Sequence, residues 1–185
     1  MANIIEKCIN VLKNPKKRTI ILAKHGFFKN MSDEDFLKMQ FKNVFGYSLN
    51  LENPKTFSEK LQWLKLYNRK PEYTMMVDKY EVKNYVASKI GEEHIIKTLG
   101  VWDRFDDIDF SQLPNQFVLK CTHDSGGLII CTDKSKLNMK AAKKKIEKSL
   151  KNDYYMQNRE WPYKNVRRRV IAEEYMVDES GYELK

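Results

Sequence analysis

The residues best suited to hold a phosphate group lie between Phe117 and Ile130. This segment reads FVLK, then CTHDSGG, then LII, so an apolar run ends in Lys120 and a second β-prone run follows Gly126 and Gly127. Such a pattern is typical of a β-hairpin. Glycines let the backbone come close to a polyanion, and Lys120 supplies a mobile positive charge, so the segment predicts a nucleotide-binding turn. The alternative is a permissive turn beside a solvent-facing lysine.

Several common functional classes find no support in the sequence. The chain has no GxxxxGK[ST] and no GxGxxG, which argues against a P-loop and a dinucleotide-binding fold. Cys8, Cys121 and Cys131 form no CxxC pair, so a disulfide framework and a zinc site are both unsupported and a reducing compartment is favoured. No cleavage-site pattern follows the amino-terminal apolar residues, and no apolar run is long enough to span a bilayer.

Helices and strands alternate around the hairpin. Ser32 with Asp35, and Thr56 with Glu59, are capping pairs that each predict a helix start. Beyond them the pattern predicts these elements: the end of the second helix at Pro71, a helix from Asp78 to Gly91 with Lys79 in its first turn, a strand over 95–102, a helix over 136–150 capped by Asp133 or Ser135, an irregular aromatic link over 154–163, and a strand over 170–176. This order predicts an α/β or α+β fold.

The charge of the chain favours an anionic partner. With 185 residues, 42% of them hydrophobic, the chain can bury a real core, and its formal net charge is +9. The excess of lysine is concentrated in one predicted helix, at Lys140, Lys143, Lys144, Lys145, Lys148 and Lys151. The simplest interpretation is that these lysines form a solvent-exposed face of that helix. The segment 4–12, followed by further basic residues, predicts either a helix that caps the domain or an amphipathic helix that lies on an anionic membrane.

Five blocks of sequence resemble a bacterial branch of the ATP-grasp superfamily, the branch named for teichuronopeptide biosynthesis and often labelled glycosyltransferase. The resemblance covers about residues 40–180. The blocks are NPKTFSEKLQW at 53–63, VDKY at 77–80, LGVW at 99–102, VLKC with HDSGG at 118–127, and REWPY at 159–163; the later strand AEEYM at 172–176 completes the order of elements. The fold implied is ATP-grasp-like: a helical amino-terminal segment over 1–50, an α/β region over 51–112, and an antiparallel-sheet nucleotide-binding subdomain over 113–185 that ends before the carboxy-terminal subdomain.

The resemblance also implies a set of residues that bind ATP. Lys79 and Lys120 would match the two lysines that reach the phosphates, and Ser125, Gly126 and Gly127 would belong to the flap that folds over them. The adenine linker would be formed by Glu173, through its carboxylate, and by the backbone of Glu174 and Met176; Asp178 or Glu179 would reach the ribose. His123 and Asp124 are signature residues of the branch, and their role stays open.

The implied chemistry is the ATP-dependent joining of a carboxylate to an amine through an acyl phosphate, in the biosynthesis of a bacterial surface polysaccharide or teichuronopeptide. ATP and magnesium are the expected cofactors, and an acidic glycan or peptide-glycan is the expected partner. The magnesium ligands would lie beyond Lys185, so we expect no metal ligands in this chain and weak or absent ligase activity. The location implied is the cytoplasm, with contact at the inner face of the membrane left open.

Two other functions are weighed beside the ligase. A glycosyltransferase would be served by a DxD-type metal motif, and Asp107-Ile108-Asp109 has that form. Asp106, Asp107 and Asp109 are more simply interpreted as solvent-facing turn residues. A basic binding module without catalysis would use the lysine-rich helix and the run 167–169, with nearby aromatics stacking on sugars or bases. Nucleic acid is not the expected partner. The acceptor carboxylate, the amine donor and the oligomeric state stay open.

Overall fold

The computed structural model describes residues 13–177, which divide into two compact units. Residues 13–74 and 153–164 form what we call the helical unit, and residues 75–152 and 165–177 form the sheet unit. The predicted boundaries at residues 50 and 112 stay a prediction. The segment 4–12, Cys8, Asp178 and Glu179 lie outside the described residues, and none of the described helices is long and apolar enough to cross a bilayer.

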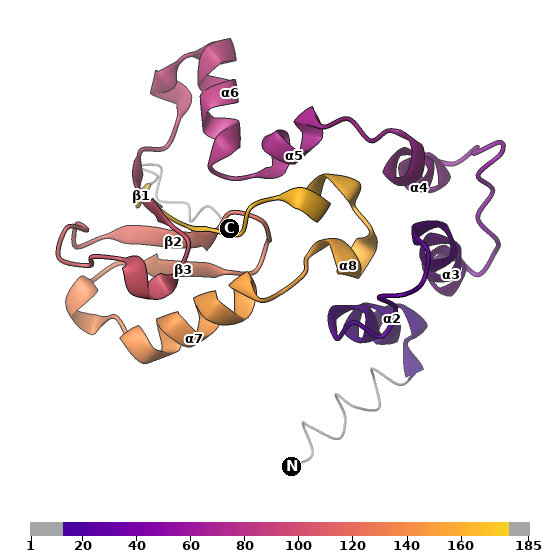
Figure 1. Ribbon diagram of the computed structural model, residues 1–185, viewed down its shortest axis with the longest axis horizontal. Helices are drawn as coiled ribbons and strands as arrows, with labels where there is room; N and C mark the ends of the chain where they lie inside the picture. Colours follow the sequence, from indigo (N-terminus) through magenta and orange to yellow (C-terminus); the bar gives the residue numbers. More distant parts are fainter. Residues whose placement is uncertain (1–12, 178–185) are drawn as a thin grey trace. The chain divides into compact units, whose positions relative to one another are not determined.

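The helical unit is built from short amphipathic helices that pack around a small aromatic core. Its elements are α2 (Pro15–Lys24), α3 (Asp33–Phe45), α4 (Phe57–Tyr67) and α8 (Tyr155–Asn158), with the 3-10 helix η4 (Trp161–Asn165) leading out of it (Figure 1). The predicted caps are confirmed: Ser32 accepts a hydrogen bond from the Asp35 backbone, and Thr56 with Glu59 forms a reciprocal capping box. The buried core is Ala23, Phe36, Leu37, Phe41 and Leu49.

Arg159 explains why α8, far along the chain, belongs to the helical unit. Its side chain is only 2% exposed, and its guanidinium donates to the Phe28 carbonyl oxygen at 2.6 Å and lies 4.8 Å from the Phe36 ring centre. Its Nε lies 3.6 Å from an Asp33 carboxylate oxygen. Because a buried cation must be paired and hydrogen-bonded, these contacts attach the 153–164 segment to α3 and to the loop that precedes it.

The sheet unit has a four-stranded antiparallel sheet in the order β1-β4-β2-β3. The strands are β1 (Thr98–Trp102), β2 (Phe117–Cys121), β3 (Leu128–Cys131) and β4 (Val170–Glu174); the helices are α6 (Glu81–Ile90) and α7 (Met139–Leu150), with 3-10 helices η1 (Glu92–His94), η2 (Phe105–Asp107) and η3 (Lys134–Lys136). Helix α5 (Glu72–Val77) spans the boundary between the units. The α+β class and the predicted hairpin are therefore confirmed.

Helix α7 covers one face of the sheet (Figure 1). Successive side chains of a strand point to opposite faces, and the alternating burial of β2 shows which face carries the core. Phe117, Leu119 and Cys121 are fully buried together with Ala142 and Ile146 of α7. The opposite face carries the intervening residues of β2, β3 and β4, which include Val118, Lys120, Leu128, Ile130, Ile171 and Glu173.

Three local predictions were wrong at the helix ends. Helix α6 begins at Glu81 and not at Asp78, because the Asp78 carboxylate accepts the backbone N–H groups of Tyr80 and Glu81, at 2.9 and 3.3 Å, and holds the chain in a turn. Lys79 therefore precedes the helix. Helix α4 ends at Tyr67 and not at Pro71. Pro71 stands directly before α5, where the missing backbone N–H of proline costs little because the first N–H groups of a helix have no partner within it.

The third error concerns the lysine-rich helix, which begins at Met139 and not at residue 136. Its cap is Asn138, whose side chain accepts the Ala141 N–H at 2.9 Å, whereas Asp133 caps the separate 3-10 helix η3. The expected lysine face is present: Lys140, Lys144, Lys145, Lys148 and Lys151 are exposed. The predicted irregular link over 154–163 is partly regular, since it contains α8 and the start of η4.

Candidate nucleotide-binding site

Lys120 lies on the sheet face opposite α7, in a buried ionic cluster with two other strand and helix residues. Its Nζ is 2.5 Å from one carboxylate oxygen of Glu173, and the Nζ of Lys83, from α6, is 2.6 Å from the other. Burial alone would raise the pKa of Glu173, but the hydrogen bonds from the two lysines outweigh burial and lower it. The Lys120 side chain is 30% exposed against 12% for Lys83, so Lys120 is the lysine that can meet a ligand.

Lys79 approaches the same region from the segment before α6. Its Nζ donates to the carbonyl oxygens of Cys121, at 2.9 Å, and Asp124, and its backbone N–H donates to the Thr122 carbonyl at 3.1 Å. Burial lowers the pKa of Lys79; the charge of Lys120 lowers it further, while Asp124 opposes the shift. The charge of Lys120 thus disfavours the charged form of Lys79, and a polyanion bound by both lysines would offset this repulsion.

His123 and Asp124 anchor the glycine turn to the carboxyl end of α7. The Asp124 carboxylate accepts hydrogen bonds from the Ser149 hydroxyl and, at 3.2 Å, from the Gly127 N–H. Nε2 of His123 lies 3.2 Å from the backbone oxygens of Ser149 and Asn152, and because carbonyls only accept, this nitrogen carries the proton. Burial lowers the pKa of His123. These hydrogen bonds join the glycine turn to the end of α7.

The two glycines of the turn differ in their surroundings. A Cβ on Gly127 would lie 2.5 Å from the Ser149 Oγ and 2.7 Å from the Cys121 Sγ, whereas a Cβ on Gly126 would meet only an Asp124 oxygen at 3.9 Å. Gly127 is buried and its N–H is already bonded to Asp124, while Ser125 and Gly126 are exposed. Gly126 is therefore the position at which a phosphate could approach the backbone, and Gly127 is required by packing.

Arg169 is a residue of this region that the sequence did not single out. Its guanidinium donates to Asp78 at 2.9 Å and to Glu81 at 2.8 Å, and it lies 4.9 Å from the centre of the Tyr80 ring. These bonds attach the segment that carries Lys79 to β4. Within the basic run 167–169, Arg169 is the buried member. Arg167 and Arg168 are exposed, and three adjacent arginines look alike in the sequence, so composition alone could not distinguish Arg169 from its neighbours.

The expected adenine linker borders a pocket of about 610 Å³ at the end of β4. Glu174 and Tyr175 line it, together with Lys97, Leu99 and residues 112–116. The Glu174 N–H donates to the Lys97 carbonyl at 3.0 Å, so this group is not available to a base. Met176 is exposed, and neither Lys79 nor Lys120 lines the pocket. The pocket is thus large enough for a nucleoside, but it does not itself contain the two lysines.

Residues 13–177 hold no group of three His, Cys, Asp or Glu side chains that could bind a metal ion. Asp106, Asp107 and Asp109 are exposed, as predicted. Asp107 pairs with Arg104 at 2.7 Å and Asp109 accepts from the Ser111 hydroxyl at 2.6 Å, so both carboxylates serve the local turn. The described side chains therefore do not fit a magnesium site, and the DxD pattern has a structural explanation.

The two described cysteines are buried, and we expect them to be unreactive in the folded protein. Burial raises the pKa of the Cys121 thiol to about 11 and also raises that of Cys131. At pH 8 roughly one Cys121 thiol in a thousand would be ionised. As the pH is raised from 8 toward 11, this fraction would increase about tenfold with each pH unit. Iodoacetamide at pH 8 should leave both residues unmodified unless urea is present, as peptide mass mapping can show. Rapid labelling of Cys121 without urea would contradict the buried position.

An antiparallel sheet with one helix-covered face, two lysines from separate segments and a glycine turn are the features of an ATP-grasp nucleotide-binding domain. The chain belongs to the TupA-like ATP-grasp family, whose family model matches residues 59–185. Comparison with curated proteins and with solved structures gave no match. The resemblance predicted from the sequence is confirmed, and the family indicates ATP binding, with magnesium as the usual companion, and ligase-type chemistry in general.

Proposed function

We propose that the sheet unit binds ATP with Lys79 and Lys120 on its phosphates and Gly126 beneath them, and that the protein takes part in joining a carboxylate to an amine. The observation that carries this proposal is that Lys79, from a distant segment, donates to the carbonyl oxygens of Cys121 and Asp124, which join the strand of Lys120 to the glycine turn. Charge neutralisation dominates phosphoryl transfer, so a polyanion is the ligand that this arrangement favours.

The reaction proposed has two balanced steps. A substrate carboxylate attacks the γ-phosphorus of ATP, which releases ADP and forms an acyl phosphate; an amine then attacks the acyl carbon, and inorganic phosphate leaves as the amide forms. Lys79 and Lys120 would stabilise the negative charge that moves among the phosphate oxygens. Magnesium would supply further charge neutralisation when bound, but we assign it no ligands among residues 13–177.

The adenine end is proposed to lie toward the exit of β4. Glu174 and Met176 would read the base through the backbone, with the Glu174 carbonyl as the acceptor because its N–H is occupied. Glu173 was predicted to accept a hydrogen bond from adenine, yet in this structure both of its oxygens face lysines. We therefore propose that Glu173 chiefly holds Lys120 in position. Ser125 would belong to the covering flap.

The substrate is proposed to be a precursor of a bacterial surface polysaccharide or of its peptide decoration, handled in the cytoplasm or at the inner face of the membrane. The naming of the matched family and the positive net charge of +9, which suits an acidic glycan or peptide-glycan, support this assignment.

Nucleotide-dependent thermal stability tests the proposed ATP site. Magnesium-ATP and magnesium-ADP should raise the melting temperature in a concentration-dependent way, and UDP-sugars at the same concentrations should not. A shift with UDP-sugars alone would favour the glycosyltransferase reading and overturn the proposal. ADP release that depends on both a carboxylate and an amine would extend the result from binding to ligation.

A further inference from the structure

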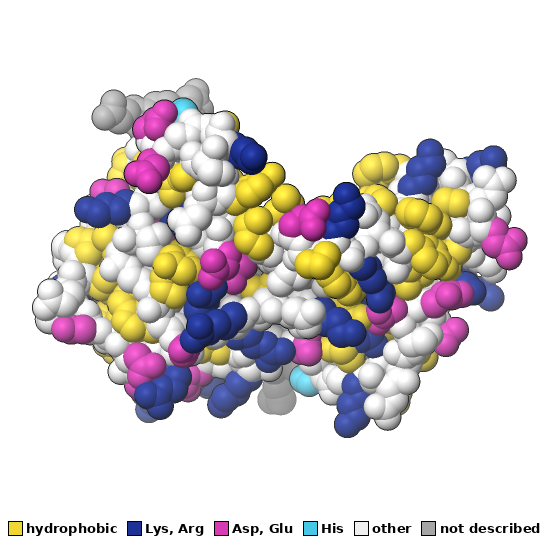
Figure 2. All heavy atoms as spheres, turned by 45° about the horizontal axis from the view of Figure 1, so that its top comes forward, with side chains coloured by type: hydrophobic (Ala, Val, Ile, Leu, Met, Phe, Trp, Pro, Cys, Tyr) yellow, Lys and Arg dark blue, Asp and Glu magenta, His cyan; other side chains and the backbone are white. Residues whose placement is uncertain are grey.

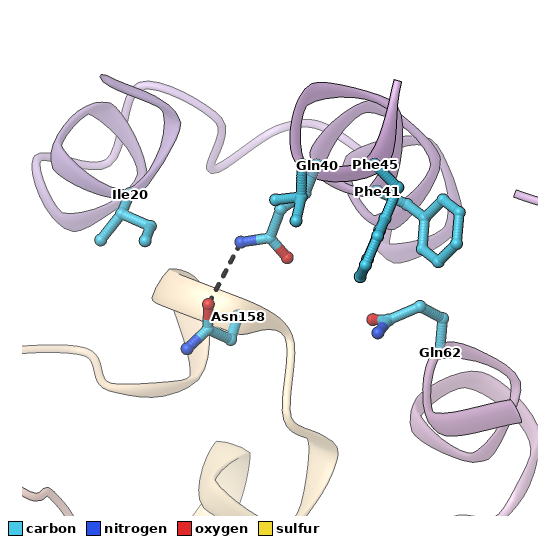
Figure 3. Close-up of a pocket in the computed structure, with 7 residues that line it drawn as sticks. Ile20, Gln40, Phe41, Phe45, Gln62 and Asn158 are labelled. Atoms are coloured by element: carbon cyan, nitrogen blue, oxygen red, sulfur yellow. Dashed lines mark hydrogen bonds between the residues drawn. The ribbon is translucent and has the colours of Figure 1, made fainter. Parts of the chain in front are cut away.

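The helical unit has a second cavity, which the proposed function does not use. It has a volume of about 140 Å³, opens to solvent, and lies among α2, α3, α4 and the end of α8 (Figure 3). Three side-chain amides line it, from Gln40, Gln62 and Asn158; the remaining lining is Ile20, Phe41, Val44 and Phe45.

The hydrogen bonds made by the three amides leave specific atoms free. Gln40 Nε2 donates to Asn158 Oδ1 at 3.1 Å, and Gln62 Nε2 donates to the Ser58 carbonyl at 3.2 Å. Within the described part of the chain, Oε1 of both glutamines and Nδ2 of Asn158 have no hydrogen-bond partner. The cavity therefore offers two amide oxygens as acceptors and, as donors, both N–H groups of Asn158 Nδ2 and the second N–H of Gln62 Nε2, all on residues from three helices (Figure 3).

This set of free atoms selects a neutral ligand with several hydroxyl groups. A phosphate or ionised carboxylate only accepts hydrogen bonds and would face two amide oxygens, and an ammonium only donates and would leave Asn158 Nδ2 unmatched. No ionisable side chain lines the cavity to pair with a charge. A peptide group carries a single N–H, so it would satisfy only one of the two oxygens, whereas adjacent hydroxyls can satisfy both and also accept from Nδ2.

The volume of the cavity and its apolar lining further restrict the class of ligand. A volume of about 140 Å³ corresponds to roughly five water molecules in the liquid, which suits a single ring and not a nucleotide. The rings of Phe41 and Phe45 lie 4.5 Å apart between centres, with their planes inclined by 38°, and Phe45 is 46% exposed, so an aromatic surface lines the cavity. Figure 2 shows hydrophobic side chains at the surface. The exposed hydrophobic residues of α3 and α4 include Val44, Phe45, Leu61, Trp63 and Leu64.

We propose that this cavity binds one neutral sugar ring, with its hydroxyls on Gln40, Gln62 and Asn158 and its C–H face against Phe45. The site would be a recognition site without chemistry of its own, since none of its side chains is a nucleophile or an acid-base group. The inference does not rest on the proposed ATP site, because the cavity lies wholly within the helical unit and its occupancy can be measured without nucleotide.

Saturation-transfer NMR with methyl glycosides of glucose, galactose and N-acetylglucosamine tests the proposal on the full chain. Val44→Trp should fill the mouth of the cavity and weaken binding at least tenfold, and Gln62→Leu should weaken it about fivefold by removing one acceptor. The matched controls are Leu64→Trp, an exposed α4 position outside the cavity, and Asn84→Leu, an exposed amide on α6 in the sheet unit. Both controls should bind like the parent protein, and circular dichroism should confirm that every variant is folded.

The expected result is a signal from at least one neutral glycoside that Val44→Trp abolishes and the controls preserve. Absence of any signal with the parent protein would overturn the proposal. So would a signal that survives Val44→Trp, because binding would then occur elsewhere. A preference for glucuronate would contradict the argument from charge, and binding of an N-acetylated dipeptide amide without any sugar would assign the cavity to a peptide.

Discussion

Gly127→Ala is expected to lower the free energy of unfolding by about 3 kcal/mol. The new methyl group would lie 2.5–2.8 Å from Ser149 and the Cys121 sulfur, and none of these atoms belongs to the end of a long flexible side chain. Ser149 is hydrogen-bonded to Asp124, and Cys121 is completely buried in the core, so neither can move without disturbing the sheet or α7. Urea denaturation followed by fluorescence and circular dichroism measures the effect.

Gly126→Ala is the matched control, and its effect should fall on binding instead of stability. Its Cβ would meet nothing nearer than 3.9 Å and Gly126 has no positive φ, so stability should change by no more than about 0.5 kcal/mol. If phosphate approaches the backbone here, the added methyl should still reduce stabilisation by ATP. Equal destabilisation by the two substitutions would show that the loop is packed differently from this structure.

The sequence predicted those features that depend on neighbouring residues. The capping pair of Thr56 and Glu59 and the hairpin ending at Gly127 are short patterns whose hydrogen bonds close within a few residues, so their geometry follows from the local order of side chains. The same reasoning placed Lys120 on a strand beside the glycine turn. The start of α6 was misplaced because Asp78 was read as the beginning of the helix, whereas its carboxylate holds a turn.

The contacts that organise the candidate site could not be predicted in this way, because they join residues far apart in the chain. Asp78 and Arg169 are 91 positions apart, and Ser149 and Asp124 are 25 apart. Neither pair belongs to a helical or strand periodicity from which the contact could be predicted. Glu173 was predicted to face adenine from the family resemblance, and its pairing with Lys83 depends on how α6 packs against β4. The structure therefore adds to the sequence analysis mainly the polar contacts between residues that are far apart in the chain.

Lys120→Met is expected to remove most of the stabilisation that ATP gives to the protein. A hydrogen bond to a charged group contributes about 1.5–3 kcal/mol, which corresponds to roughly 10- to 100-fold weaker binding when it is lost. At a nucleotide concentration about 100 times the parent dissociation constant, ATP would stabilise the parent protein by about 2.7 kcal/mol. A 100-fold weaker variant would retain only about 0.4 kcal/mol. Thermal melts with and without magnesium-ATP measure this difference.

Lys83→Met separates phosphate binding from the structural role of the same ionic cluster. Both lysines bind Glu173, at 2.6 and 2.5 Å, so either substitution leaves that buried carboxylate with one partner and should cost a similar amount of stability, about 1 kcal/mol. Lys83 is the more buried of the two, and two of its three N–H groups are directed to Glu173 and to the Ile96 carbonyl, so it is less available to a phosphate than Lys120. The ATP effect should therefore survive Lys83→Met. If both variants lose it equally, Lys120 acts through Glu173 and not on the phosphates; if both keep it, the proposed site is wrong.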